Sequence, residues 1–398
     1  MNNLLLNKKV AIIGGGPGGL MLGRLLQNSG VEVKIYERDF DQYVRQQGST
    51  LDMHYHTGLK AITEGGLLEE FKKKYRPGAN KSVILNSKME ILLDEHDNEN
   101  KSKEDFGEEN FRPEIDRQDL RDMLVDSIKT ENIIWNARFS ELKTFGAGWE
   151  IYFENGDVAY ADLVIAADGA NSKLRRYITD IPPQYSGVTS IEGNILNADV
   201  NAPKLWQLVK GGSMFALEDG KTIMFITKGN GTLTFLIGLK VSENWLAESG
   251  IDLGNKGSVA EWFKREFADW SNNWQELFQS DAVTMAPRLW YHFPADQHWE
   301  ALPNLTIIGD AAHRIPAYAG EGANQALADA FDLYKALCCQ ESETMQHAIA
   351  SYEEKMFRRS AAATIESVRN TENFHSENNL RHLMDLFGNS ISAENRDQ

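Results

Sequence analysis

The chain opens with a change of hydrophobic spacing that is typical of a β–α–β unit. Residues 9–13 form a short apolar run, residues 17–28 carry apolar side chains at helical spacing, and residues 31–36 alternate apolar and polar positions. Short apolar or alternating runs are typical of strands, and apolar residues three and four apart are typical of a helix. Further buried strands are predicted at residues 163–166 and 305–308. This pattern predicts an α/β domain with a parallel sheet.

The spacing changes after about residue 183. Short alternating segments now follow one another, separated by glycine-containing turns, which predicts a largely antiparallel sheet. The predicted strands of this sheet are residues 191–200, 213–217, 222–227 and 232–240. Helices are predicted at residues 118–129, 259–269, 274–278, 322–337, 345–367 and 378–387, and the charged residues 94–109 are predicted to form an exposed loop.

These two patterns divide the 398-residue chain into interleaved domains. We predict a discontinuous nucleotide-binding α/β domain made of residues 1–185 and 289–372. The antiparallel sheet of residues 186–288 would form the substrate domain, and residues 373–398 would form a C-terminal helix. Two domains are the usual expectation for a chain of this length.

Charge and cysteine content narrow the possible partners and the compartment. The net charge is −17, with 58 acidic and 41 basic residues, so the field of the whole protein repels nucleic acid and anionic membranes. No run approaches 18 uninterrupted apolar residues, which excludes a predicted membrane-spanning helix. The only cysteines, Cys338 and Cys339, are adjacent and do not resemble a disulfide framework or a zinc site. We expect a cytoplasmic monomer.

The glycines between the first strand and the first helix predict a Rossmann-like dinucleotide site. Gly14, Gly16 and Gly19 have the spacing in which the glycines allow a tight turn, a close approach of backbone to pyrophosphate, and close helix–strand packing. Glu37 ends the second strand, where a carboxylate can accept hydrogen bonds from ribose hydroxyls, and Arg38 follows it. A turn with only a packing role is the alternative. The motif alone does not separate FAD from NAD.

Three later stretches support a more specific resemblance. They are RPEIDRQDLRDML, ADLVIAADGANSKLRR and LTIIGDAAHRIPAYAGEGANQALADA. Together with the glycine motif and YERD, they resemble the class A flavoprotein monooxygenases, the para-hydroxybenzoate hydroxylase-like family. Within that family, QGSTLDMH, PEIDRQDLR and NIIW look most similar to the tetracycline-inactivating flavin monooxygenases. The resemblance covers nearly the whole chain.

The resemblance implies a set of cofactor-binding residues. It implies that Asp310 accepts a hydroxyl of the FAD ribityl chain, that Arg45 contacts NADPH, and that backbone N–H groups near Gly322 face the flavin ring. We expect Glu321 to point away from a reduced, anionic flavin. The alternatives are local roles: a helix cap for Asp310, a strand-end turn for Asp168, and solvated charges for Arg45 and Arg117. The full implied set is Gly14, Gly16, Gly19, Glu37, Arg38, Arg45, Asp52, Arg117, Asp168, Asp310, Pro316, Gly320, Gly322, Ala323 and Asn324.

The resemblance also implies the reaction. In this family NADPH (or NADH) reduces FAD, and O₂ then forms a C4a-hydroperoxide that hydroxylates an electron-rich carbon of a phenol or enolate. The cofactor carries the chemistry, so we expect no catalytic side chain; the protein positions the substrate and excludes water. His54 and His56 form a weak metal-site pattern without a third ligand, and we predict no metal. The expected partners are O₂ and a small polycyclic aromatic molecule.

The predicted substrate sheet departs from its nearest likeness. Tetracycline-inactivating relatives hold their substrate with a Gln, an Arg and a His at positions that here are Glu192, Ser213 and Thr234. This loss removes charge-assisted donors to an enolate, which predicts another binding pose or another substrate. Phe215 and Met224 are candidates for an apolar lining, with core packing as the alternative. A flavin-dependent halogenase, whose usual W-x-W-x-I-P stretch is absent, and a non-catalytic flavin or ligand binder are competing functions.

Overall fold

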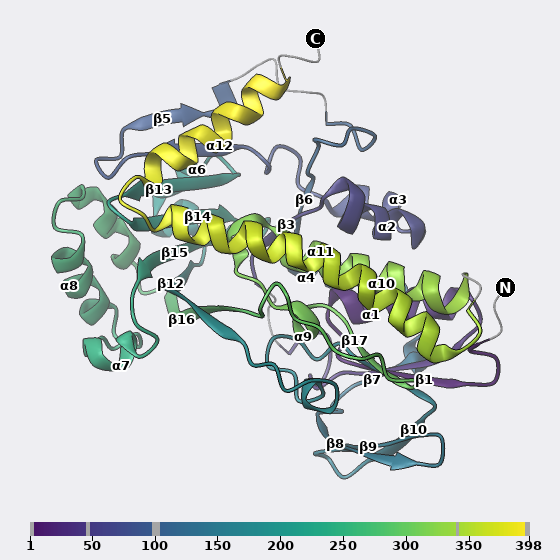
Figure 1. The fold of residues 1–398 in the computed structure, drawn as a ribbon. Coiled ribbons are helices and arrows are strands. Elements are labelled where there is room, and N and C mark those ends of the chain that lie inside the picture. Colours follow the sequence, from purple (N-terminus) through teal and green to yellow (C-terminus); the bar gives the residue numbers. More distant parts are fainter. Residues whose placement is uncertain (1–3, 45–47, 98–103, 340–341, 395–398) are drawn as a thin grey trace. The chain divides into compact units, whose positions relative to one another are not determined.

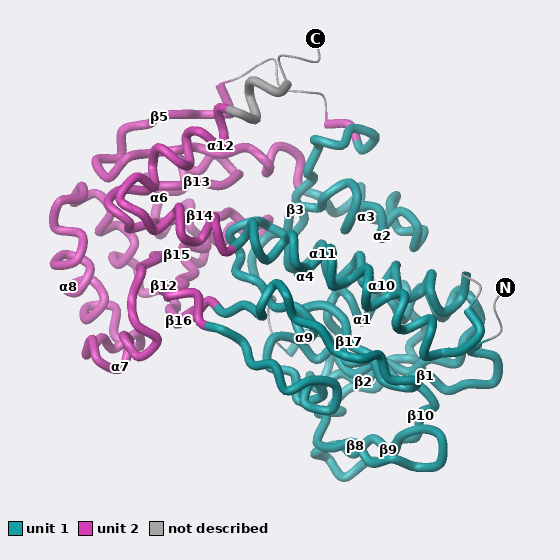
Figure 2. The backbone as a smooth tube through the Cα atoms, viewed as in Figure 1, with its two compact units in different colours: residues 1–75, 106–184, 291–367 teal, residues 76–105, 185–290, 368–398 magenta. Residues whose placement is uncertain are grey.

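A computed structural model describes residues 4–44, 48–97, 104–339 and 342–394. The chain forms two compact units, shown in different colours in Figure 2. The first unit contains residues 1–75, 106–184 and 291–367, and the second contains residues 76–105, 185–290 and 368–398. The second unit therefore includes residues 76–105, which the sequence predicts within the nucleotide-binding domain, and residues 368–372 together with the C-terminal helix.

A five-stranded parallel sheet forms the centre of the first unit, with the strand order β17-β11-β1-β2-β7. The middle strands β1 and β11 are almost entirely apolar and buried, as expected for parallel strands covered on both faces. Helix α1 packs so closely on α10 that a side chain at Gly18 would contact the backbone of Ala326. Figure 1 shows α10 and α11 running side by side over this part of the unit.

Smaller sheets complete the first unit. Strands β8, β9 and β10 form an antiparallel meander, and β3 pairs with β6. The strands of this unit are β1 (Lys9–Ile13), β2 (Glu32–Tyr36), β3 (Thr50–Asp52), β6 (Glu114–Asp116), β7 (Ile133–Ile134), β8 (Phe139–Phe145), β9 (Gly148–Phe153), β10 (Val158–Ala161), β11 (Leu163–Ala166) and β17 (Leu305–Ile307). Its helices are α1 (Pro17–Asn28), α2 (Lys60–Glu64), α3 (Leu68–Lys74), α4 (Arg117–Asp126), α9 (Asp310–His313), α10 (Glu321–Cys338) and most of α11 (Met345–Phe374).

The second unit is built on a seven-stranded sheet with the order β16-β12-β15-β14-β13-β4-β5. The pairs β12–β15, β15–β14, β14–β13 and β4–β5 are antiparallel, β13 pairs with β4 in parallel, and one face is covered by a core rich in aromatic residues. The strands are β4 (Ser82–Leu85), β5 (Ile91–Asp94), β12 (Gln184–Ile195), β13 (Ser213–Glu218), β14 (Lys221–Thr227), β15 (Leu233–Lys240) and β16 (Val283–His292). The helices are α5 (Ala198–Asn201), α6 (Pro203–Val209), α7 (Trp245–Ser249), α8 (Lys256–Glu266) and α12 (Asn379–Glu394).

The predicted fold class is confirmed: a mixed α/β protein with a parallel nucleotide-binding sheet and a largely antiparallel second sheet. One strand was predicted too far along the chain, at residues 191–200, whereas β12 spans Gln184–Ile195. Strand β12 ends at Ile195, because Asn197 adopts a left-handed conformation and the short helix α5 follows. Among the described residues, no helix combines the length and the apolar character needed to cross a bilayer.

Candidate functional site

The glycine turn after β1 contains one glycine that packing does not explain. Gly14 has φ +117°, and side chains at Gly14 or Gly19 would collide with backbone oxygen atoms of Ala167 and Gly14, respectively. Gly16, the N-cap of α1, has an ordinary φ of −79° and nothing within 4 Å of where its Cβ would lie. The space beside Gly16 is therefore open at the start of α1, where free N–H groups favour an anion.

Glu37 is fixed directly on this turn. Its side chain is buried, Gly15 N–H donates to Glu37 Oε2 at 2.6 Å, and Asp39 N–H donates to Glu37 Oε1 at 3.0 Å. Each carboxylate oxygen can accept a further hydrogen bond, so the acid remains able to receive a hydroxyl. Arg38, by contrast, is exposed.

Asp168 follows β11 at the same edge of the parallel sheet. Its Oδ2 atom accepts hydrogen bonds from the N–H groups of Lys173 at 2.8 Å and Leu174 at 3.3 Å. Its Oδ1 atom is buried and has no hydrogen-bond partner among the described residues. Burial raises the pKa of Asp168 above its usual value. A buried carboxylate oxygen without a partner is costly, which indicates a position completed by a bound molecule.

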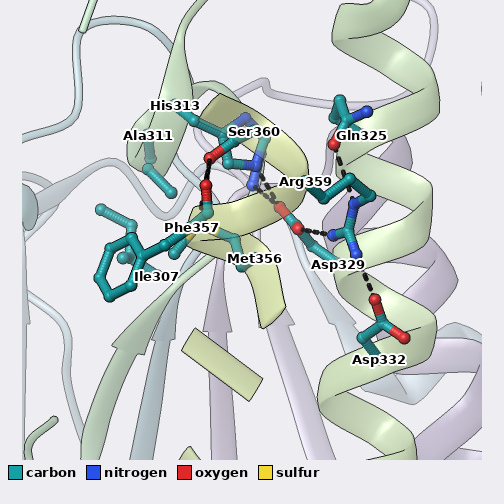
Figure 3. A network of polar contacts seen from close by, with 12 residues as sticks. Ile307, Ala311, His313, Gln325, Asp329, Asp332, Met356, Phe357, Arg359 and Ser360 are labelled. Atoms are coloured by element: carbon teal, nitrogen blue, oxygen red, sulfur yellow. Dashed lines mark hydrogen bonds and ion pairs between the residues drawn. The ribbon is translucent and has the colours of Figure 1, made fainter. Parts of the chain in front are cut away.

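The turn after β17 is held by a buried polar network, shown in Figure 3. Gly309, with φ +62°, donates its N–H to Asp329 Oδ2 at 2.8 Å, and His313 Nε2 lies 2.5 Å from the same oxygen. Arg359 on α11 bonds both Asp329 and Asp332 on α10. Burial alone would raise the pKa of Asp329, but the charges of His313 and Arg359 hold it below its usual value. The network fixes the turn that presents Asp310.

Asp310 lies next to the first turn of α10. A Cβ at Gly322 would lie 3.8 Å from Asp310 Oδ1, and Gly320, the N-cap of α10, has φ +66°. A Cβ at Gly320 would lie 2.7 Å from Asp52 Oδ1, so the turn allows no side chain there. The carbonyl oxygen of Pro316, which begins this approach to α10, accepts a hydrogen bond from Ser367 Oγ at 2.5 Å.

Asn324 joins α10 to β3. Its side chain is fully buried, and its Nδ2 atom donates to the carbonyl oxygens of Asp52 at 2.8 Å and Gly320 at 2.9 Å. Its Oδ1 atom accepts from the N–H of His54 at 2.9 Å. Asn324 therefore fixes β3 against the α10 terminus.

Asp52, His54 and Glu321 form a charged cluster at this junction. His54 Nε2 lies 2.8 Å from Asp52 Oδ2, and His54 Nδ1 lies 3.2 Å from Glu321 Oε1. Burial lowers the pKa of His54, but hydrogen bonds to both carboxylates outweigh it and raise the pKa to about 9. Glu321 therefore turns toward His54, and its other oxygen accepts from Gln325. No group of three or more His, Cys, Asp or Glu residues within the described ranges could hold a metal ion.

Most of the predicted cofactor residues gather at the carboxyl edge of the parallel sheet and at the start of α10. They are Gly14, Gly16, Gly19, Glu37, Asp168, Asp310, Gly320, Gly322, Ala323 and Asn324, with Asp52 on the adjoining β3. Arg117 begins α4 after β6, the partner strand of β3, and its N–H donates to Ser49 O at 3.1 Å. Arg45 lies outside the described residues.

The sequence pattern did not identify His54, Asp329 or Arg359 as parts of the site. Asp52 and His54 are two residues apart on an extended segment, a spacing that puts both side chains on one face. The spacing of Asp52 and His54 was therefore visible in the sequence. Their partner Glu321 was not, because it lies 267 residues beyond His54 in the chain. Arg359 likewise reaches Asp329 across 30 positions.

The predicted substrate residues lie in the second unit, on the sheet face opposite its core. The register pairs Glu192 with Leu236, Leu236 with Met224, and Met224 with Phe215, which gives one row across four strands. Arg288 on β16 contacts Glu192 through two hydrogen bonds, 2.5 Å from Nε and 3.2 Å from Nη2. The adjoining row is Asn194, Thr234, Ile226 and Ser213. The first row is thus apolar except at Glu192, and the second is polar at both ends.

Comparisons with known proteins agree with this architecture. Monooxygenase penA of Penicillium thymicola is 26% identical over 376 residues, which cover 83% of this chain and 84% of penA. The structure of Klebsiella pneumoniae HpxO complexed with FAD and uric acid superposes with a TM-score of 0.73 at 18% identity, covering 98% of this chain and 94% of HpxO. For tetracycline destructase Tet(55) the TM-score is 0.71 at 18% identity, with 93% and 90% covered. At these identities the two structures show a shared fold.

The site also fits the cofactor of this fold. An open glycine turn, an acid on the neighbouring strand, an unpaired carboxylate oxygen and a second helix start suit an extended dinucleotide with two ends. Residues 7–367 match the family described as FAD binding domain. The chain therefore belongs to this family of FAD-dependent class A flavoprotein monooxygenases.

Proposed function

We propose that this protein uses NADPH or NADH and O₂ to hydroxylate a polycyclic phenolic or enolic molecule. The observation that carries the substrate class is the row of Glu192, Leu236, Met224 and Phe215 in the second unit. Its middle is apolar and its side chains are only partly buried, while one end carries the Glu192–Arg288 pair. Such a surface is complementary to a flat molecule with an apolar body and one polar edge.

The cofactor would be held along the carboxyl edge of the parallel sheet. In this proposal the pyrophosphate lies at Gly16, the adenosine ribose at Glu37 and the ribityl chain at Asp310, with Asp168 between them. The flavin ring would then lie near Asp310 and the first turn of α10. Backbone N–H groups of that turn would stabilise negative charge on the ring. Bound FAD supplies hydride acceptance and oxygen activation; the chain binds, orients and excludes water.

In this proposal the chain does not use a second dinucleotide-binding fold for the nicotinamide nucleotide. The sequence contains one Gly-x-Gly-x-x-Gly motif, at Gly14–Gly19, and the later Gly229–Gly231 pair lies in the turn between β14 and β15. We therefore expect brief docking of NADPH or NADH rather than stable binding. The reductant would be released after each reduction.

A tetracycline-like antibiotic is a specific candidate substrate within this class. Its fused rings and enol groups match the surface described above, and the name of Tet(55) records activity on that class of molecule. Glu192 already pairs with Arg288, so the polar end of the row is electrically neutral. This favours a neutral hydroxyl or amide edge on the substrate over a strongly anionic enolate.

The test is oxygen-dependent nicotinamide oxidation by the FAD-loaded protein. Tetracyclines and phenolic polyketides are screened one at a time with NADPH and with NADH, and products are examined by mass spectrometry. A compound that stimulates NADPH oxidation and gains one oxygen atom supports the proposal. Substrate-dependent halogen incorporation would instead support a halogenase. Tight flavin that neither nicotinamide reduces would support a non-catalytic binding protein.

A further inference from the structure

Both ring nitrogens of His54 face carboxylate oxygens. Asp52 approaches Nε2 at 2.8 Å and Glu321 approaches Nδ1 at 3.2 Å. An ionised carboxylate only accepts hydrogen bonds, and a neutral imidazole has only one N–H. Both contacts can be hydrogen bonds to ionised carboxylates only if both nitrogens carry protons. With both carboxyl groups ionised, this geometry indicates an imidazolium cation.

The position of the ring is held from several sides. Asn324 on α10 binds the backbone of both His54 and Asp52, which fixes the backbone of the two residues against α10. The charged groups that face the cluster are Asp52 from β3, Glu321 from α10, and Arg112, whose Nη1 lies 3.7 Å from Asp52 Oδ2. Two carboxylates and two cations bring the cluster to electrical neutrality. The side chain of His54 is only 12% exposed, so solvent screens these charges weakly.

Glu321 poses an electrostatic problem for the proposed cofactor position. It is the first residue of α10, directly between Gly320 and Gly322, and Gly322 lies beside Asp310. An uncompensated carboxylate there would cancel the positive potential of the helix N-terminus and disfavour a flavin that gains negative charge on reduction. His54 is the cation that contacts Glu321 in the structure.

We propose that His54 is a positioning residue that keeps Glu321 turned away and electrically neutralised, so that the first turn of α10 can stabilise reduced flavin. The inference rests on the proposed position of the flavin ring against α10. It predicts that the charge of the cluster, and not its hydrogen bonding alone, sets the balance between oxidised and reduced cofactor.

The test is the reduction potential of bound FAD, measured by equilibration with an indicator dye during slow chemical reduction without nicotinamide or substrate. His54→Gln should weaken the preference for reduced over oxidised flavin by about tenfold or more, which is about 30 mV for a two-electron couple. Glu321→Gln alone should shift the potential upward. The double variant His54→Gln/Glu321→Gln should return close to the unaltered protein. His56→Gln is the matched control, because His56 is exposed and pairs with exposed Glu109.

Two results would overturn the inference. One is an unchanged potential in His54→Gln or in Glu321→Gln. The other is a double variant that keeps the full shift of His54→Gln, since Glu321 would then not be the group that His54 neutralises. If His54→Gln does not fold, Glu321→Gln decides alone.

A measurement on the cofactor-free protein separates this inference from the proposed function. Nitrogen NMR of the imidazole groups should show both nitrogens of His54 protonated near neutral pH, with the signal assigned by its loss in His54→Gln. In Glu321→Gln, His54 should lose its proton at a lower pH. A neutral His54 in the unaltered protein refutes the cluster's charge, whereas failure to bind FAD would refute only the cofactor position.

Discussion

The side-chain oxygen of Asn324 accepts a hydrogen bond from the backbone N–H of His54 at 2.9 Å, across 270 positions of the chain. Replacing Asn324 with Asp keeps this acceptor but removes the donors to Asp52 and Gly320 and adds a buried charge. We expect a loss of about 1–3 kcal/mol of stability, as for other unsatisfied buried groups. FAD affinity should fall by about tenfold or more, equivalent to about 1.4 kcal/mol. Thermal unfolding and flavin fluorescence titration measure the two effects, with exposed Asn110→Asp as the control.

The glycine turn offers a matched pair of substitutions. Gly19→Ala should destabilise the protein itself, because the new methyl group meets the carbonyl oxygen of Gly14. Gly16→Ala should leave the cofactor-free protein folded, because its methyl group meets no protein atom within 4 Å. If pyrophosphate lies there, Gly16→Ala should nevertheless weaken FAD binding by at least about tenfold. Normal FAD affinity in a folded Gly16→Ala variant would assign this turn a packing role only.

Two adjacent arginines on α11 should differ sharply in their contribution to stability. Arg359 bonds Asp329, which is fully buried, whereas Arg358 pairs with Glu354 on the exposed surface. Removing one partner of a buried ion pair costs about 3–5 kcal/mol, and removing an exposed pair costs about 0.2–1 kcal/mol. Arg359→Leu should therefore lower the unfolding midpoint far more than Arg358→Leu. Equal effects in chemical denaturation would show that Asp329 does not depend on Arg359.

The sequence predicted the elements whose signal is local. Strand β1, helix α1 and strand β2 were predicted almost to the residue. The spacing of their apolar residues and the glycines that separate them are both visible within a few positions of the chain. The end of β12 was missed, since the left-handed turn at Asn197 gives little pattern of its own. The parallel pairing of β4 with β13 was also not predicted, because it joins strands about 130 residues apart in the chain.

The sequence indicated which residues belong to the candidate site more fully than it indicated what each of them does there. Glycine spacing and the acid at the end of β2 can be read locally, and the structure brings them together at one edge. Asn324 was predicted to bind the cofactor, and in the structure its side chain forms hydrogen bonds with the backbone of Asp52 and His54. Glu321 was expected to point away from the flavin ring, and in the structure it contacts His54, which only the folded chain brings within 3.2 Å. Roles that depend on distant partners cannot be read from one segment.

The stability of the protein should fall as pH rises through the titration of His54. Its pKa is raised from 6.5 to about 9, so its cluster contributes fully below about pH 6.5 and is lost as pH rises through about 9. A shift of this size corresponds to about 3 kcal/mol. Burial also raises the pKa of Glu353 from 4.5 to about 7. The ionisation of Glu353 therefore also lowers stability as pH rises, over a pH range that overlaps the lower part of the His54 titration.

The contribution of His54 is therefore isolated by difference. Unfolding midpoints of the unaltered protein and of His54→Gln are compared from about pH 6 to about pH 9.5, where the difference between them should shrink steadily. Glu353 is present in both proteins, so its contribution cancels in the difference between their midpoints. His56→Gln lacks only an exposed imidazole and should follow the unaltered protein. A gap that stays constant with pH would mean that His54 contributes by packing and neutral hydrogen bonds, and that its ring is not charged between Asp52 and Glu321.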